Sequence, residues 1–318
     1  MKVMSHTSIQ VIFCLTAWVS TAAAAPPPQP VGTLVDVGGY RVHLYCTGTG
    51  SPVVVVVGGA FSFDWGLVQP GVSQFTRICT YAPSGTAWSD PPPPQHQNPP
   101  VPLCIDRVEE IHRLLQNAPI PEPYVLVGFS IGGLISRLYT NKYPDTVAGL
   151  VIVDHAFTDV DRDASGPPQV PSAKTSLDAP GSSTNSAPVL IFAPPITLGL
   201  EDDENFRKLP VRNQYLHRWA MSQHPLRSTS TMADECAAAL DRATQRQAHP
   251  LGNRPLVVIR TNNDTGGYAE LQAQLLQLSS NSREVVAGQS SHMVIIDEPD
   301  LVIRAIRETV NAVKSTAH

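Results

Sequence analysis

The sequence predicts an α/β protein built on a mostly parallel sheet, and three observations predict it. Apolar runs of strand length alternate with amphipathic runs of helical spacing up to residue 154 and again after residue 250. Residues 53–57 are five consecutive valines, which is typical of a strand buried on both faces. The chain has 318 residues, enough for one large domain with an insertion where the alternation stops.

The expected elements follow in order from residue 31. A hairpin is expected over residues 31–37 and 40–46, because Gly38-Gly39 between them can form a two-residue turn. The further strands are expected at residues 53–57, 76–81, 124–128, 149–153, 256–260 and 283–287. The helices are expected at residues 106–117, 131–143, 271–278 and 300–313, where apolar residues recur at helical spacing.

The insertion covers residues 155–250. Helices are expected at 205–223, interrupted by Pro210, and at 231–247, after a loop rich in Pro, Ser, Gly and Ala. We interpret the insertion as a cap over the sheet. The predicted domains are a signal peptide at 1–25, a core at 26–154 and 251–318, and the cap at 155–250.

The first 25 residues have the pattern of an export signal. An apolar run from Ile9 to Val19 is followed by small residues at Ala22 and Ala24 that suit a cleavage site. This run is shorter than the roughly 20 apolar residues of a spanning helix, and no later segment is long and apolar enough. The sequence therefore predicts a secreted or periplasmic protein with no stable membrane span in the mature chain.

Four cysteines remain after removal of the signal, and they permit two disulfides in three connectivities. Cys46 and Cys79 lie near predicted neighbouring strands, which would leave Cys104 for Cys236. No spacing of Cys and His indicates a metal site, and no motif indicates an organic cofactor. A net charge of −5 without basic clusters argues against a nucleic-acid partner.

The strongest local motif is Gly128-Phe129-Ser130-Ile131-Gly132, a G-x-S-x-G pattern. It directly follows a buried strand and directly opens a helix, which is the context of a nucleophile elbow. A side chain at position 128 or 132 would crowd the neighbouring strand and helix. Ser130 is the predicted nucleophile, and the alternative is an idle serine in a glycine-rich packing turn.

At these residues the chain resembles the α/β-hydrolase fold family, in the branch of exported or uncharacterised serine hydrolases. The resemblance covers about residues 31–313 and rests on Val35–Gly39, Tyr45–Gly50, Asp64-Trp65, Gly128–Gly133, Leu150–Asp154, Ser291-His292 and Asp297–Asp300. It implies a mostly parallel eight-stranded sheet flanked by helices, with a helical cap inserted after the sixth strand.

The base and the acid of the implied catalytic triad come from later strand ends. His292 lies between the last strand and the last helix, where the family's catalytic histidine sits. The acid is Asp154, which ends the sixth strand, or Asp264, just past the seventh. Both loops lie at the same edge of the sheet, so both remain open, and we favour Asp154.

Two backbone N–H groups are expected to form the oxyanion hole: those of Ile131 and Ala60. The chain departs from the family in three places. Gly58-Gly59 stands where His-Gly is frequent, Phe129 where the residue before the nucleophile is frequently His, and Ala82-Pro83 where Asp-Arg is usual. At Gly58-Gly59 the backbone donor remains but side-chain support of the loop is lost. The changes at Phe129 and Ala82-Pro83 predict a more apolar mouth that favours an apolar acyl or alkyl group.

The resulting hypothesis is an exported, carboxylesterase-like serine hydrolase that cleaves an ester or related acyl bond of a small molecule through an acyl-enzyme. The same constellation serves amide, lactone and thioester cleavage. A different class, a non-catalytic small-molecule-binding protein on the same fold, is the alternative.

Overall fold

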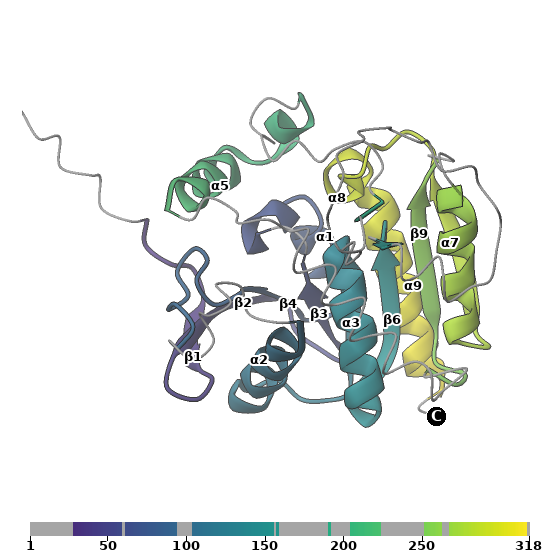
Figure 1. Ribbon diagram of the computed structural model, residues 1–318, viewed down its shortest axis with the longest axis horizontal. Coiled ribbons are helices and arrows are strands. Elements are labelled where there is room, and N and C mark those ends of the chain that lie inside the picture. Colours follow the sequence, from purple (N-terminus) through teal and green to yellow (C-terminus); the bar gives the residue numbers. More distant parts are fainter. Residues whose placement is uncertain are drawn as a thin grey trace, which may run out of the picture.

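The computed structural model describes residues 28–58, 61–93, 104–155, 157–158, 190–191, 204–223, 251–262 and 267–316. Its centre is an eight-stranded sheet of order β1-β2-β4-β3-β5-β6-β9-β10 (Figure 1). The strands are β1 Thr33–Asp36, β2 Arg41–Thr47, β3 Val53–Val57, β4 Ile78–Ala82, β5 Tyr124–Phe129, β6 Val147–Val153, β9 Leu256–Thr261 and β10 Ser282–Ala287.

The pairing confirms the predicted sheet. Strand β2 runs antiparallel to β1 and to β4, and the other neighbouring pairs are parallel. The hairpin expected around Gly38-Gly39 is the β1–β2 pair, with Val35 opposite Val42. Two further short strands, β7 Phe157–Thr158 and β8 Leu190–Ile191, pair with each other outside this sheet.

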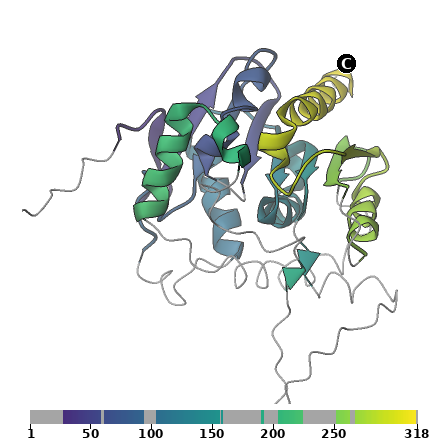
Figure 2. The same ribbon diagram turned by 90° about the horizontal axis from the view of Figure 1, so that it is seen from above.

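Helices cover both faces of the sheet (Figures 1 and 2). One face packs against α2 Cys104–Asn117, α3 Ile131–Lys142 and α7 Tyr268–Gln274. The opposite face packs against α1 Gln69–Val72, α8 Val294–Asp297 and α9 Pro299–Thr316. The valine run of β3 explains this arrangement, because Val53, Val55 and Val57 enter the first core and Val54 and Val56 the second.

The described part of the insertion includes α5 Val211–Gln223, which Figure 1 shows beyond the carboxyl edge of the sheet. The expected helix at 205–223 is two elements, η5 Glu204–Lys208 and α5 Val211–Gln223, because Pro210 separates them. Helix η5 packs on α8, and α5 packs on η1 Ser62–Trp65. The expected helix at 231–247 lies outside the described residues.

Several bounds differ from those expected from the sequence. The helix expected at 271–278 consists of α7 followed by η7 Leu275–Leu278. Helix α9 begins at Pro299, a residue favoured at the first helical position. The short elements η1, α1, η3 Pro144–Thr146 and α8 were not expected, since three or four residues are too few to show a period.

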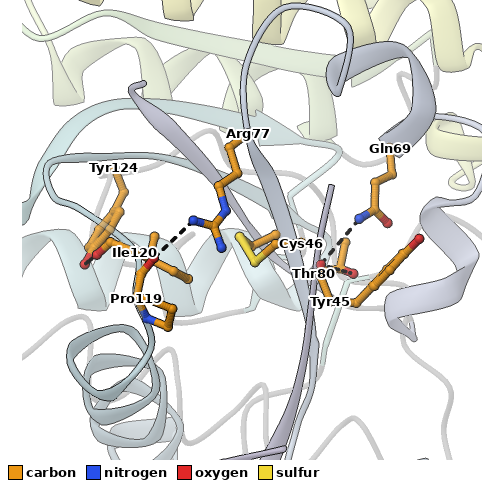
Figure 3. The surroundings of a disulfide bond; sticks show 9 residues. Tyr45, Cys46, Gln69, Arg77, Thr80, Pro119, Ile120 and Tyr124 are labelled. Carbon is orange, nitrogen blue, oxygen red and sulfur yellow. Dashed lines mark hydrogen bonds between the residues drawn. A yellow bond between two sulfur atoms is a disulfide. The ribbon is translucent and has the colours of Figure 1, made fainter. Parts of the chain in front are cut away.

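A disulfide joins Cys46 and Cys79, which are opposite residues of β2 and β4 (Figure 3). The guanidinium of nearby Arg77 donates to the Pro119 carbonyl oxygen at 3.0 Å. Cys236 and the side chain of Cys104 lie outside the described residues. Among the residues that the structure describes, no helix is both long and apolar enough to cross a membrane.

Candidate active site

Ser130 occupies a sharp turn between β5 and α3. Its backbone has φ 54° and ψ −124°, and its N–H donates to the Val153 carbonyl oxygen at 3.0 Å. A Cβ at Gly128 would lie 2.6 Å from the Gly132 carbonyl oxygen, and one at Gly132 would lie 2.0 Å from that of Val57. Both glycines are therefore required by close backbone approach, as the motif predicts.

His292 lies in the loop between β10 and α8, and it faces Asp154 at the end of β6. The distance between His292 Nδ1 and Asp154 Oδ2 is 2.6 Å. The other carboxylate oxygen, Oδ1, accepts a hydrogen bond from the Thr261 N–H at 3.1 Å, at the end of β9. Because a carboxylate only accepts, Nδ1 of His292 carries the proton in this bond.

The backbone of Asp154 is held by the next strand. Its N–H donates to the Ile259 carbonyl oxygen at 2.7 Å, and its φ of 43° turns the chain sharply at the end of β6. The residue is fully buried. Burial, followed by the negative charge of Asp154, raises the pKa of Tyr268 well above its usual value, so this neighbouring phenol stays protonated.

The opposite nitrogen of His292, Nε2, is buried and has no hydrogen-bond partner among the described residues. The neutral imidazole that is protonated at Nδ1 has its lone pair at Nε2, the form that a general base needs. The structure therefore brings His292 and Asp154 into contact, and Ser130 lies on the turn after β5 at the same edge of the sheet.

An aromatic pair supports the histidine. The ring of Phe129 lies 5.0 Å from that of His292, centroid to centroid, and the Trp65 ring meets Phe129 edge-on at 6.4 Å. Both aromatic residues are buried. Phe129, which stands where the family frequently has histidine, therefore packs against the catalytic candidate rather than supplying a polar group.

Two carboxylates hold the loop that carries His292. Asp297 Oδ2 accepts hydrogen bonds from the N–H and the hydroxyl of Ser291 at 2.9 and 2.7 Å. Glu298 Oε1 accepts from the Gln289 N–H and the Ser290 hydroxyl at 2.9 and 3.0 Å. Both acids belong to the stretch that resembles the family, but no role was predicted for them from the sequence. The sequence feature that could have indicated this role is the pair of carboxylates shortly after the Ser-Ser-His run, where they can accept local hydrogen bonds.

Two predicted site residues lie outside the described residues: Ala60 and the alternative acid Asp264. The other expected oxyanion donor, Ile131, is the first residue of α3, and helix-start N–H groups lack intrahelical partners. Within the described ranges, no group of three or more His, Cys, Asp or Glu side chains could hold a metal ion.

The segment after β4, where the family usually has Asp-Arg, is held from α2. Glu110 Oε1 accepts from the Ser84 N–H at 3.1 Å and from Arg107 Nη1 at 2.9 Å. Arg107 Nη1 also donates to the Ser84 hydroxyl at 3.2 Å. These buried contacts hold Ser84, so the position of the chain after Ala82-Pro83 is fixed although no aspartate stands there.

A sheet of this order, with a serine at a strand-to-helix turn and a His–Asp pair at the same edge, defines an α/β hydrolase. The family model described as "alpha/beta hydrolase fold" matches residues 52–299, so the chain belongs to that family.

Individual proteins resemble the chain to different extents. It is 25% identical over 206 residues to "Uncharacterized protein YqjL" of Bacillus subtilis (strain 168), covering 63% of this chain and 62% of that protein. The chain spans less than two thirds of the length of the curated relatives it matches.

Solved structures share the fold. A putative lipase from Acinetobacter baumannii AYE matches with a TM-score of 0.59 at 16% identity, over 89% of this chain and 92% of that one. A thermophilic esterase from Thermogutta terrifontis matches with a TM-score of 0.56 at 18% identity, over 88% and 98%. An epoxide hydrolase from Bacillus megaterium matches with 0.61 at 13% identity, over 88% and 100%. The family model and these neighbours show the fold that the chain shares with α/β hydrolases.

Proposed function

We propose that this protein is a serine hydrolase that cleaves a carboxylic ester through an acyl-enzyme. Ser130 is the nucleophile, His292 the general base and acid, and Asp154 the residue that orients the imidazole. The observation that carries the proposal is the 2.6 Å hydrogen bond between His292 and Asp154. It forms at the edge of the sheet where Ser130 occupies the sharp turn between β5 and α3.

The chemistry follows from these positions. Ser130 Oγ attacks the acyl carbon while Nε2 of His292 takes the hydroxyl proton, and Asp154 stabilises the imidazolium. The alcohol leaves with that proton. Water then attacks the acyl-enzyme, again giving its proton to His292, which returns it to Ser130 Oγ as the carboxylic acid departs. The N–H groups of Ile131 and Ala60 are proposed to stabilise the oxyanion in both steps.

The direct test is turnover of short p-nitrophenyl esters. We expect Ser130→Ala to lower kcat at least about a thousandfold, because removing the nucleophile leaves only binding and oxyanion stabilisation. A fluorophosphonate should label the wild-type chain at one site and leave the variant unlabelled. Equal turnover by both proteins would exclude the proposed mechanism.

The choice of acid gives a separate prediction. Asp154→Ala should lower kcat about 10³- to 10⁴-fold, because His292 loses the partner that sets its tautomer. The matched control, Asp264→Ala, should keep activity within about threefold of wild type. Circular dichroism and thermal unfolding verify that both variants fold. A large loss in the control alone would assign the acid to Asp264.

The acyl preference follows from the residues around the histidine. Phe129 packs against His292, and Trp65 packs edge-on against Phe129, so the surroundings of the imidazole on this side are apolar. We therefore propose an apolar acyl or alkyl group in the substrate. A panel of p-nitrophenyl esters should show kcat/KM rising from acetate to butyrate or longer chains, and a preference for charged acyl groups would contradict this.

We also propose that the protein is exported, by residues 1–25. The support is the signal-like pattern of that segment and the disulfide between β2 and β4, a bond that persists in oxidising compartments. Expression of the full chain should yield a protein outside the cytoplasm that begins near Ala25 or Pro26. Deletion of residues 2–25 should leave it in the cytoplasm.

A further inference from the structure

A second buried His–Asp pair lies away from the first. His217 of α5 and Asp64 of η1 are 153 residues apart in the sequence, and His217 Nδ1 lies 2.9 Å from Asp64 Oδ1. Their side chains are 3% and 1% exposed. The rings of Phe206 and Phe61 pack on the imidazole at centroid distances of 4.9 and 5.3 Å.

The same carboxylate also holds the chain that enters η1. Asp64 Oδ2 accepts a hydrogen bond from the Phe61 N–H at 2.9 Å, and the Asp64 N–H donates to the Phe61 carbonyl oxygen at 3.0 Å. Phe61 directly follows Ala60, the residue we propose as an oxyanion donor. Asp64 is thus bonded both to the cap helix and to the peptide group next to that donor.

A further contact joins the same two elements. The Asn213 side-chain amide, one turn before His217 on α5, donates to the Phe63 carbonyl oxygen at 2.5 Å. Residue Trp65 follows Asp64 and packs edge-on against Phe129, which in turn lies against His292. Helix η1 therefore touches the cap on one side and the support of the catalytic histidine on the other.

The hydrogen bonds of the pair allow only one orientation of α5 relative to η1. Apolar packing alone allows small shifts between elements, whereas a carboxylate with one oxygen on an imidazole and the other on a backbone N–H fixes a single arrangement. A buried carboxylate that loses one of these donors retains its desolvation cost. The pair therefore resists displacement of α5 relative to the Phe61 peptide.

We propose that His217 and Asp64 are positioning residues that couple the cap helix α5 to the peptide group of Phe61, next to the proposed oxyanion donor Ala60. The pair holds the Phe61 N–H in the geometry required when the substrate acylates Ser130, and it does so only while α5 is docked. This role rests on the proposed serine hydrolase function. It gives the cap a part in the rate of the reaction and not only in substrate choice.

The test compares three variants with a control on the same helix. His217→Phe keeps an aromatic ring and removes the donor, Asp64→Asn removes the charge, and His217→Asn offers an amide N–H in place of Nδ1–H. Tyr215→Ala changes a residue that is 51% exposed on α5. The concentration of active sites is first measured by fluorophosphonate titration, so that misfolded protein does not count. Then kcat and KM are measured with p-nitrophenyl butyrate.

We expect kcat per titrated site to fall about tenfold in His217→Phe and Asp64→Asn, with KM within about threefold, because a displaced oxyanion donor stabilises the transition state less. His217→Asn should recover most of this loss, and Tyr215→Ala should match wild type. Wild-type kcat per site in both His217→Phe and Asp64→Asn would overturn the proposal.

Hydrogen exchange supplies a readout that does not depend on activity. The peptide that contains residues 61–68 should exchange faster in His217→Phe than in wild type, although the substitution lies on α5. Unchanged exchange there overturns the coupling. Equal turnover by wild type and Ser130→Ala would instead contradict the proposed function, and the exchange result would still decide whether the pair couples the two elements.

Discussion

At the scale of single residues, the proposed site contains residues with strained backbone conformations. Among the described non-glycine residues, positive φ occurs at Ala87, Ser130 and Asp154, and two of these three are the proposed nucleophile and acid. Such conformations cost about 1–3 kcal/mol each. The cost is offset by the sheet, because each residue donates its N–H to the neighbouring strand, at Val153 and Ile259 respectively.

A residue outside the site predicts how stability depends on pH. His43 of β2 is buried, its ring lies 4.6 Å from that of Trp88, and its Nε2 contacts the Val31 carbonyl oxygen. Burial lowers the pKa of His43 below its ordinary value, and the Val31 contact offsets this only in part. As pH falls below about 6.5, the unfolded chain binds this proton more readily than the folded one.

The free energy of unfolding should therefore be at its full value above about pH 6.5 and should fall as the pH drops through the unfolded pKa towards the lower folded one. His43→Phe keeps a ring against Trp88 and has no proton to bind. Urea unfolding at pH 7.5, 6.5 and 5.5 should show a smaller loss in this variant than in wild type. If the free energy of unfolding changed with pH by the same amount in both proteins, His43 would not be a source of the pH dependence.

At the scale of elements, the loop between β10 and α8 determines where His292 stands. Asp297 holds that loop through Ser291, and its side chain is 3% exposed while that of its ion-pair partner Lys208 is 50% exposed. A buried carboxylate with two local donors contributes more than an exposed ion pair does.

Asp297→Ala should therefore lower kcat/KM about tenfold, since hydrogen bonds to a charged group contribute about 1.5–3 kcal/mol and their loss releases the His292 loop. Lys208→Ala, which removes only the partner at 3.5 Å, should stay within about threefold of wild type. Both are measured with p-nitrophenyl butyrate after active-site titration. A larger loss in the lysine variant would mean that the ion pair, not the Ser291 bonds, holds the loop.

The sequence predicted the long elements better than the short ones. Strand β3 was predictable because five consecutive valines are typical of a strand that is buried on both faces. Helix η1 was not expected, because Ser62–Trp65 is four residues long and all four are buried for tertiary reasons. The second His–Asp pair was missed for the same reason, since no local pattern links Asp64 to a histidine in the cap.

The site was predictable in part. The Ser130 elbow has a local signature that needs only a strand before it and a helix after it. The sequence favoured Asp154 but left Asp264 open as the acid, because strands β6 and β9 are neighbours and end at the same edge. A contact across 138 residues, such as His292 to Asp154, depends on the order of strands in the whole sheet.

At the scale of the whole molecule, the sheet has a parallel part that carries the site and an antiparallel end formed by β1, β2 and β4. The Cys46–Cys79 disulfide lies in that end and closes a loop of 33 residues that contains β3. Residue Cys79 is fully buried. The disulfide therefore restricts the unfolded chain around the first parallel strand.

Replacing both cysteines, as Cys46→Ala with Cys79→Ala, should lower the free energy of unfolding by about 3–4 kcal/mol, because a loop of this length regains its conformational freedom in the unfolded state. Urea unfolding monitored by circular dichroism measures the loss. Reduced wild type should show a similar loss, and any further effect of the reductant on the double variant would report a bond among the remaining cysteines. Ester turnover per titrated site should stay near the wild-type value, since Ser130, His292 and Asp154 all lie on the parallel part of the sheet. A double variant that unfolds at the wild-type urea concentration would show that strand pairing alone already restricts this end of the molecule.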